Sequence, residues 1–223
     1  MKTENDSGSL VVIENSNTEW TSSPESGVES KRFERSGEGN STRATSIVKF
    51  PADRQFAPHT HFGGEEFLVL DGVFSDGTGN FPQGFYVRNP VGSSHSPWSE
   101  PGAVIFAKIG QFDSRDPNYV RLDTKGADWQ NYPEQGMKVL LLHQFEDECT
   151  FLVSLDSGHV FPQSGFVGGL EIFVVSGQLT VSDNDMMTHD WMRSAHEEDI
   201  RITSRERAVF YLKTGHMAAD SAK

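Results

Sequence analysis

The sequence contains an internal repeat: residues 105 positions apart match along the chain, beginning with Phe56 and Phe161. No gap is needed along the match. The other repeated residues are Gly63-Gly64 with Gly168-Gly169, Glu66 with Glu171, Val69 with Val174, Gly72 with Gly177, Arg88 with Arg193, Ala103-Val104 with Ala208-Val209, Phe106 with Tyr211 and Lys108 with Lys213. A repeat constrains architecture strongly, because the same turns and strand faces must recur in both copies. We therefore predict two copies of one fold in tandem.

Short apolar runs separated by Gly, Pro, Asp or Asn dominate both halves. They are rich in β-branched and aromatic residues, as strands are, and helical periodicity is hard to find. The runs are 46–50, 67–70, 104–107, 139–142, 151–153, 172–175 and 208–211. Regularly spaced short strands predict an all-β fold of two tandem jelly-roll barrels, also called double-stranded β-helices, whose interior can hold a metal ion at one mouth.

The composition along the chain predicts four segments. Residues 1–18 are polar and rich in Ser, Asn and Glu, so we expect them to be disordered. Residues 19–112 form the first domain. Residues 113–136 are polar and punctuated by Pro and Gly, which predicts a linker. Residues 137–217 form the second domain.

A cluster of metal-ligating residue types lies in the first domain. His59 and His61 are two residues apart, so on a strand their imidazoles point to the same face. Gly63 and Gly64 can bend the backbone and swing Glu65 toward that pair, and His95 must come from a distant strand. A His-x-His pair alone is more typical of a surface or hydrogen-bonded pair. With the carboxylate and the third imidazole added, the pattern favours one site for a divalent metal ion.

The repeat separates candidate ligands from scaffold residues. At the same spacing His59 becomes Ser164, His61 becomes Phe166, Glu65 becomes Leu170 and His95 becomes Ile200. A single metal site in the first domain explains why all four disappear together, and it predicts a second domain without metal ligands. Glu66 persists as Glu171, and because adjacent strand residues face opposite ways we expect Glu66 to point outward and Glu65 inward. Glu65 is therefore the chosen ligand, and Glu66 is the alternative.

These residues also carry a resemblance to known proteins. His-x-His, three residues, Glu, six residues and Gly, followed by Pro-x-Gly-x-x-His, resembles the two signature motifs of the cupin superfamily. The segment 58–112 is similar to the cupin-like domain of ChrR anti-sigma factors. The stretches that carry this closer similarity are His59-Thr60-His61-Phe62-Gly63-Gly64-Glu65-Glu66, Val69-Leu70-Asp71-Gly72-Val73-Phe74 and Arg88-Asn89-Pro90. The resemblance implies a cupin domain with His59, His61, Glu65 and His95 as metal ligands, and the repeat extends this to a tandem bicupin. The resemblance is specific over roughly residues 20 to 113 and weaker afterwards.

In the ChrR family the cupin-like domain is a metal-binding module of a transcription regulator. It is attached to the regulator of an extracytoplasmic-function sigma factor, and its signal is oxidative stress such as singlet oxygen or peroxide. The resemblance therefore implies a protein partner in sigma-factor regulation. The family's anti-sigma domain carries a His-x-x-x-Cys-x-x-Cys zinc pattern, whereas residues 1–58 contain neither Cys nor His, and Cys149 is the sole cysteine. We therefore expect the sigma-binding zinc domain to be missing.

The ligand set leaves the metal and the function open. Four protein ligands can close a tetrahedral zinc site, so zinc is the expected ion, with iron, manganese or nickel as alternatives. The first hypothesis is a sensory or regulatory module in which an oxidant or small ligand acts at the metal. The second is an iron-dependent dioxygenase of a small organic substrate, since a redox metal would keep a position open. The third is a structural sugar- or acid-binding bicupin with an incidental ion.

Charge and composition narrow the partners. The net charge of −13, from 32 acidic and 19 basic residues, opposes binding to phosphate backbones, so no direct nucleic-acid partner is expected. No apolar run approaches the roughly 18 residues of a membrane span, and the polar start lacks a signal-peptide core. We expect a cytoplasmic protein without a membrane partner. Tandem barrels can mimic a cupin dimer within one chain, so a monomer or a homodimer is expected.

Overall fold

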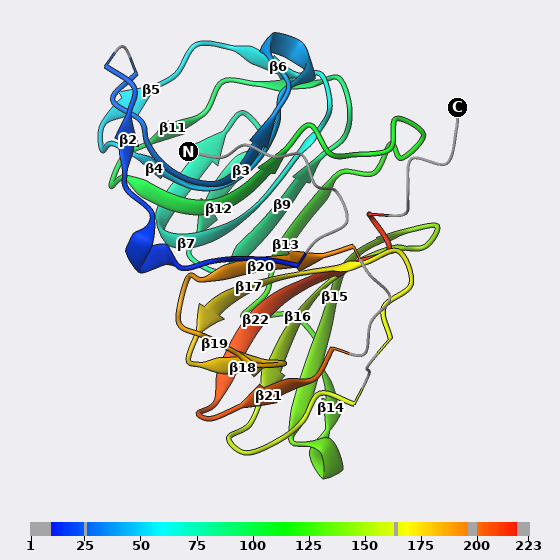
Figure 1. The fold of residues 1–223 in the computed structure, drawn as a ribbon. Helices are drawn as coiled ribbons and strands as arrows, with labels where there is room; N and C mark the ends of the chain where they lie inside the picture. The colour runs from blue at the N-terminus through cyan, green and yellow to red at the C-terminus, as the bar shows by residue number, and fades with distance from the viewer. Residues whose placement is uncertain (1–9, 25, 163–164, 196–199, 218–223) are drawn as a thin grey trace. The chain divides into compact units, whose positions relative to one another are not determined.

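The computed structural model describes residues 10–24, 26–162, 165–195 and 200–217, and these are built almost entirely of antiparallel strands (Figure 1). The described residues contain three short 3-10 helices, η1 (Asn15–Asn17), η2 (Gly39–Ser41) and η3 (Pro133–Gln135). The predicted all-β class is confirmed. Within the described residues no helix has the length and apolar character needed to cross a membrane.

The chain forms two compact units. The first unit is Thr18–Ala127, and the second unit contains the described residues of 10–17 and of 128–217. The strands of the first unit are β2 (Thr21–Ser22), β3 (Glu29–Ser36), β4 (Arg43–Phe50), β5 (Arg54–Gln55), β6 (His59–His61), β7 (Glu65–Asp76), β8 (Gly79–Pro82), β9 (Phe85–Asn89), β10 (Ser93–His95), β11 (Trp98–Ser99), β12 (Ala103–Ile109) and β13 (Val120–Asp123). Its main sheet runs in the order β13-β9-β7-β12-β4-β3-β2, and β6 pairs with β10 in a separate two-stranded sheet.

Strand alternation places the core of the first unit. On β7 the side chains of Phe67 and Val69 share one face with Glu65, and both belong to a buried cluster that also contains residues of β9 and β12. The same face therefore carries apolar side chains along the strand and a carboxylate at its beginning. This alternation positions Glu65 inside the unit, next to the β6-β10 pair.

The second unit repeats this topology. Its strands are β1 (Val11–Ile13), β14 (Gln130–Tyr132), β15 (Met137–Phe145), β16 (Glu148–Leu155), β17 (Leu170–Ser176), β18 (Leu179–Val181), β19 (Asn184–Met186), β20 (Trp191–Ser194), β21 (Ile202–Ser204) and β22 (Ala208–Thr214). The main sheet runs β1-β20-β17-β22-β16-β15-β14. At the 105-residue spacing β7 corresponds to β17, β9 to β20 and β12 to β22, and these strands occupy the same places in the two sheet orders. The repeat in sequence is thus a repeat in strand order.

Two predicted segment boundaries differ from the structure. Within the predicted disordered segment 1–18, residues 1–9 lie outside the described residues, but β1 pairs with β20 of the second unit. The predicted linker 113–136 contributes β13 to the first unit and β14 to the second, and the units meet in sequence at Ala127 and Asp128. Composition misplaced β13 and β14 because an edge strand gains its stability from backbone pairing along one side and tolerates polar residues. It misplaced β1 because this short apolar strand lies within a polar segment.

Candidate metal centre

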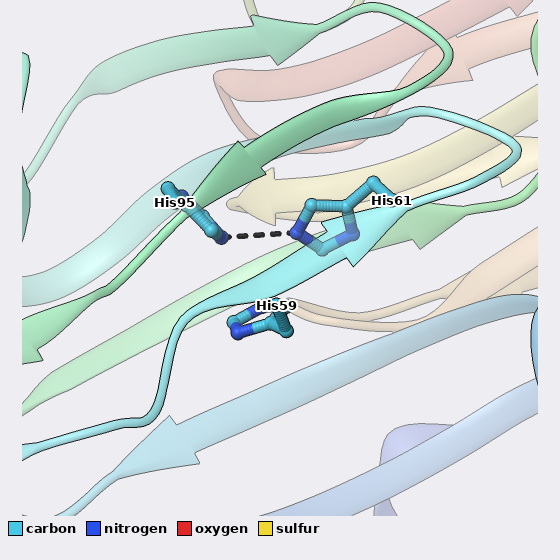
Figure 2. Close-up of side chains that lie close together, drawn as sticks. All are labelled: His59, His61 and His95. Carbon is cyan, nitrogen blue, oxygen red and sulfur yellow. Dashed lines mark hydrogen bonds between the residues drawn. The ribbon is translucent and has the colours of Figure 1, made fainter.

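Three histidines from two paired strands come together in the first unit. In the β6-β10 register His95 lies opposite His59, and Ser93 lies opposite His61. The ring centroids of the three imidazoles are 4.8 to 4.9 Å apart, and one nitrogen of each ring lies within 4.8 Å of the others. Figure 2 shows the rings close together, two carried by β6 and one by β10. These three histidines form a group that can hold a metal ion.

Hydrogen bonds orient two of the imidazoles. The Nδ1 atom of His59 lies 3.0 Å from the carbonyl oxygen of Ala57, and the Nδ1 atom of His95 lies 3.2 Å from Oδ2 of Asp76. A carbonyl and an ionised carboxylate only accept hydrogen bonds, so each Nδ1 carries the proton and each Nε2 carries the lone pair. Partners of this kind hold metal-ligating histidines in the correct tautomer.

The nitrogen atoms of His61 and His95 are already close enough to share an ion. Their Nε2 atoms are 2.9 Å apart, drawn as the dashed line in Figure 2. Two nitrogens that each lie about 2.0–2.1 Å from a tetrahedral zinc ion are separated by ~3.3 Å. A shift of a few tenths of an ångström therefore separates this geometry from shared coordination.

A tight turn brings Glu65 to the same nitrogens. Gly64 has a φ of +77°, which glycine adopts without strain, and its N–H donates to the carbonyl of His61 at 3.1 Å. A Cβ atom at Gly64 would lie 2.1 Å from the ring of Phe112, so the position accepts no larger residue. After this turn, Oε2 of Glu65 lies 3.3 Å from Nε2 of His61 and 3.7 Å from Nε2 of His95.

Asp76 supports the centre from the far end of β7. Burial opposes ionisation of this carboxyl, but hydrogen bonds from His95 and Thr78 and the charge of Arg121 outweigh it and lower the pKa to about 2. The backbone N–H and the hydroxyl of Thr78 donate to Oδ1 at 2.7 and 2.6 Å, which leaves Oδ2 for His95. Asp76 is therefore an anion at neutral pH and a strong acceptor for the His95 ring.

Burial also prepares His61 as a ligand. It lowers the pKa of His61 below the ordinary 6.5, and the neighbouring His95 and His59 act in the same direction, while Glu65 opposes them in part. Only the neutral imidazole can coordinate a metal ion. The surroundings of His61 thus favour its ligating form.

A second chain of hydrogen bonds fixes Glu65. The amide of Asn89 donates to Oε2 of Glu65 at 3.0 Å, and its Oδ1 accepts from Nη2 of Arg121 at 2.6 Å. Arg121 lies on β13, within the segment that composition had assigned to a linker. That segment therefore contributes to the positioning of the centre.

A pocket of about 480 Å³ opens onto the centre. It is lined by His59, Glu65 and His95 together with serine, threonine and apolar side chains of the same unit. The volume lies within the range of small-molecule sites. His59, Glu65 and His95 are thus accessible from the pocket.

Glu66 faces away from the histidines, as strand alternation predicts, but it is not exposed to solvent. It is 1% exposed and accepts a hydrogen bond from the hydroxyl of Tyr86. Strand alternation gives the direction of the Glu66 side chain, but it does not show whether other side chains cover that face of β7. Glu65, not Glu66, is the carboxylate beside the imidazoles.

The second unit replaces the cluster with apolar side chains. Phe166, Leu170 and Ile200 stand where the first unit has His61, Glu65 and His95, and all three belong to one buried cluster. Ser164, the counterpart of His59, lies outside the described residues. Each described counterpart is therefore a core residue.

Sequence reasoning missed the supporting residues. Asp76 becomes Val181 at the repeat spacing, and Val181 is buried in the same apolar cluster. The comparison that had separated Glu65 from Glu66 would have identified Asp76, had it been extended to every polar residue. Asn89 and Arg121 offered no comparable signal, because polar residues near strand ends are common.

Solved structures share this fold at low sequence identity. A protein of Nostoc punctiforme PCC 73102 that has been proposed to be a dioxygenase is 13% identical, with a TM-score of 0.74 and coverage of 95% of this chain and 85% of that chain. The Escherichia coli pirin YhhW in complex with nickel(II) is 17% identical, with a TM-score of 0.67 and coverage of 92% and 98%. The Lactobacillus farciminis oxalate decarboxylase formate complex is 9% identical, with a TM-score of 0.65 and coverage of 92% and 86%.

The family comparison covers nearly the whole chain. No curated protein matches the sequence. The model of the ChrR cupin-like domain matches twice, over residues 9–113 and 118–218, so the similarity extends through the second half as well. These two matches follow the 105-residue repeat, and the protein belongs to the ChrR cupin-like domain family, with the domain present twice in tandem.

Proposed function

We propose that the first unit is a metal-binding sensory module and that both units are cupin barrels. His59, His61 and His95 hold one divalent ion, zinc by preference, and Glu65 is the fourth ligand. The observation that carries this proposal is the convergence of three imidazoles and one carboxylate beside a pocket, with two of the imidazoles, His59 and His95, oriented by hydrogen bonds. An ion there would link β6 and the start of β7 to β10, which lies further along the chain.

The regulatory part of the proposal concerns the pocket. An oxidant or small ligand that reaches the ion through the pocket changes the ligand set, and with it the arrangement of the strands that the ion links. A protein partner in sigma-factor-linked regulation binds differently to the changed surface. Membership of the ChrR cupin-like family supports this role, and the second, apolar unit is a metal-independent platform for the partner.

A metal-dependent dioxygenase is the second candidate, because His59, Glu65 and His95 all line the pocket, so a substrate can reach the ion. When bound, iron would supply redox chemistry with dioxygen at an open coordination position. Glu65 is then the residue able to accept a proton from substrate. Iron-loaded protein would consume oxygen with diketones or flavonols, and the absence of turnover with any reconstituted metal would exclude this candidate.

The decisive experiment is elemental analysis of protein purified without added metal. We expect about one ion per chain in the wild type and loss of the ion in His59→Ala. His159→Ala is the matched control. The Nδ1 atom of His159 lies 3.2 Å from the carbonyl oxygen of Ser157, two residues earlier, much as His59 lies near Ala57, but His159 belongs to the second unit. Zinc would favour the sensor and iron the oxygenase.

Two outcomes would contradict the metal proposal. One is wild-type protein without stoichiometric metal, even after incubation with zinc, iron, manganese or nickel. The other is equal metal content in His59→Ala and His159→Ala. Circular dichroism of both variants would show whether each retains its strands, so that loss of the ion is not mistaken for loss of the fold.

A further inference from the structure

One wall of the pocket carries an arginine that has no partner among the residues that the structure describes. Ser30 and Arg32 lie two residues apart on β3, so both face the same side of the sheet, and both line the pocket. The guanidinium of Arg32 makes no hydrogen bond or ion pair with any residue that the structure describes, and the side chain is exposed. A permanently charged side chain therefore lines the pocket without a counter-ion among the described residues.

Two other arginines of the same unit, Arg88 and Arg121, are engaged by the protein. Arg88 forms a 2.8 Å ion pair with Asp116 and is 1% exposed. Arg121 donates to Asn89 and to the carbonyl of Arg88. Arg32 differs from both because its charge faces a cavity, where a ligand can reach it.

The remaining side chains that line the pocket indicate what kind of molecule could bind beside Arg32. Phe50, Phe56, Phe74 and Pro97 supply apolar surface, and Thr21, Ser22, Ser23, Ser26 and Ser30 supply hydroxyls. The apolar residues suit a hydrocarbon or aromatic body, while the hydroxyls can donate to oxygen atoms. A guanidinium is planar and always protonated, and its paired N–H groups match a carboxylate.

We propose that the pocket beside the metal centre binds a small organic carboxylate, with the carboxylate at Arg32 and an apolar body against Phe50 and Phe56. The inference rests on the proposed metal function, since the same pocket opens onto His59 and His95. With a divalent ion in place, the charges of the ion and of Arg32 together exceed the single negative charge of Glu65 in the lining, which favours an anion over a neutral molecule of the same shape. Arg32 is then the residue that determines the ligand class.

Isothermal titration of zinc-loaded protein with matched acids and amides tests the proposal. Benzoate and hexanoate should bind at least about tenfold more tightly than benzamide and hexanamide. The amides are neutral, so they cannot form the charged hydrogen-bonded pair with Arg32 that the carboxylates form. Arg32→Gln should remove most of that difference. Arg35→Gln is the control, since Arg35 is an exposed arginine on the same strand and is not part of the pocket lining.

The outcomes separate this inference from the metal proposal. Metal content is measured on the same samples, and wild-type protein that cannot hold an ion contradicts the metal function itself. If the ion is bound but the acids bind no better than the amides, or if Arg32→Gln and Arg35→Gln bind benzoate equally, the carboxylate assignment is wrong and the metal centre stands.

Discussion

The main sheets of the two units have corresponding strand orders, but the units differ in the side chains at the buried positions that correspond to His61, Glu65 and Asp76. In the first unit His61, Glu65 and Asp76 are buried there, although each carries polar atoms that burial penalises. In the second unit the counterparts Phe166, Leu170 and Val181 are part of an apolar cluster. A fold that forms with an apolar interior at this place has no structural need for a polar one, so the polar residues of the first unit agree with the proposed metal site.

A different set of polar residues is retained in both units. Glu66 and Lys108 are buried in the first unit, and Glu171 and Lys213 are buried in the second. Tyr86 donates to Glu66, and its counterpart Trp191 donates through Nε1 to Glu171 at 2.6 Å. The aromatic donor changed while the carboxylate stayed, which marks these residues as scaffold. Joint loss and joint retention thus distinguish function from architecture within a single chain.

Exchanging residues between the two units should produce the largest effect. Leu170→Glu places a carboxylate in an apolar cluster at a position that is 0% exposed, and it should lower the free energy of unfolding by about 3 kcal/mol or more. The reverse change, Glu65→Leu, removes a buried carboxylate and should change the stability of the metal-free protein by only about 1 kcal/mol while weakening metal binding. Urea denaturation measures both changes.

Leu170→Met is the control for the first substitution, since it conserves volume and should cost less than about 1.5 kcal/mol. If Leu170→Glu and Leu170→Met were equally stable, the second unit would contain a polar environment that the structure does not indicate. The comparison between the two interiors would then be wrong.

Removing the metal should destabilise one unit and leave the other unchanged. A ligand present at a hundred times its dissociation constant stabilises the state that binds it by about 2.7 kcal/mol. Addition of a chelator should therefore reduce hydrogen-exchange protection in β6, β7 and β10 by up to this amount. Protection of β17 and β22 should stay the same, because the counterparts of the ligands there are apolar.

The same chelation on the His59→Ala variant serves as the control, since that variant should show low protection in β6 and β10 before chelator is added. Equal losses of protection in β7 and β17 would contradict the assignment of the ion to the first unit alone.

Sequence alone predicted the features that repeat or that follow strand alternation. The tandem arrangement, the strand runs and the side of β7 on which Glu65 lies all follow from period and spacing. His95 was assigned to the cluster although it lies 34 residues from His61, and the β6-β10 pairing places the two Nε2 atoms 2.9 Å apart. Such features depend on local pattern, which a sequence displays directly.

Strands and contacts that depend on pairing between distant parts of the chain could not be predicted from the sequence. Val11–Ile13 belongs to a short apolar run, 10–13, within a polar segment, and Val120–Asp123 lies in polar surroundings, yet each completes an edge of a sheet. Their stability comes from backbone partners far away in the chain, at Trp191–Arg193 and at Phe85–Arg88. The support of His95 by Asp76 also joins two strands, and although the repeat distinguishes Asp76 from its counterpart Val181, it does not show which histidine Asp76 contacts.

Asp76 offers the finest test of the difference between the units. Asp76→Asn keeps the size of the side chain, but an amide nitrogen cannot accept a hydrogen bond from His95, and a neutral amide oxygen accepts more weakly than a carboxylate. Loss of such a supporting carboxylate typically lowers metal affinity by about 10- to 100-fold. Competition with a chelator of known affinity measures the change, and the three histidines should still bind one ion.

Asp71→Asn provides the matched control on the same strand, because Asp71 is exposed and its neutralisation should leave metal affinity unchanged. Elemental content alone could not detect a tenfold change when the site is saturated, so the competition assay is required. If Asp76→Asn and Asp71→Asn bound the ion equally well, the orientation of His95 would be set by packing, and the carboxylate of Asp76 would belong to the scaffold even though the second unit has replaced it with Val181.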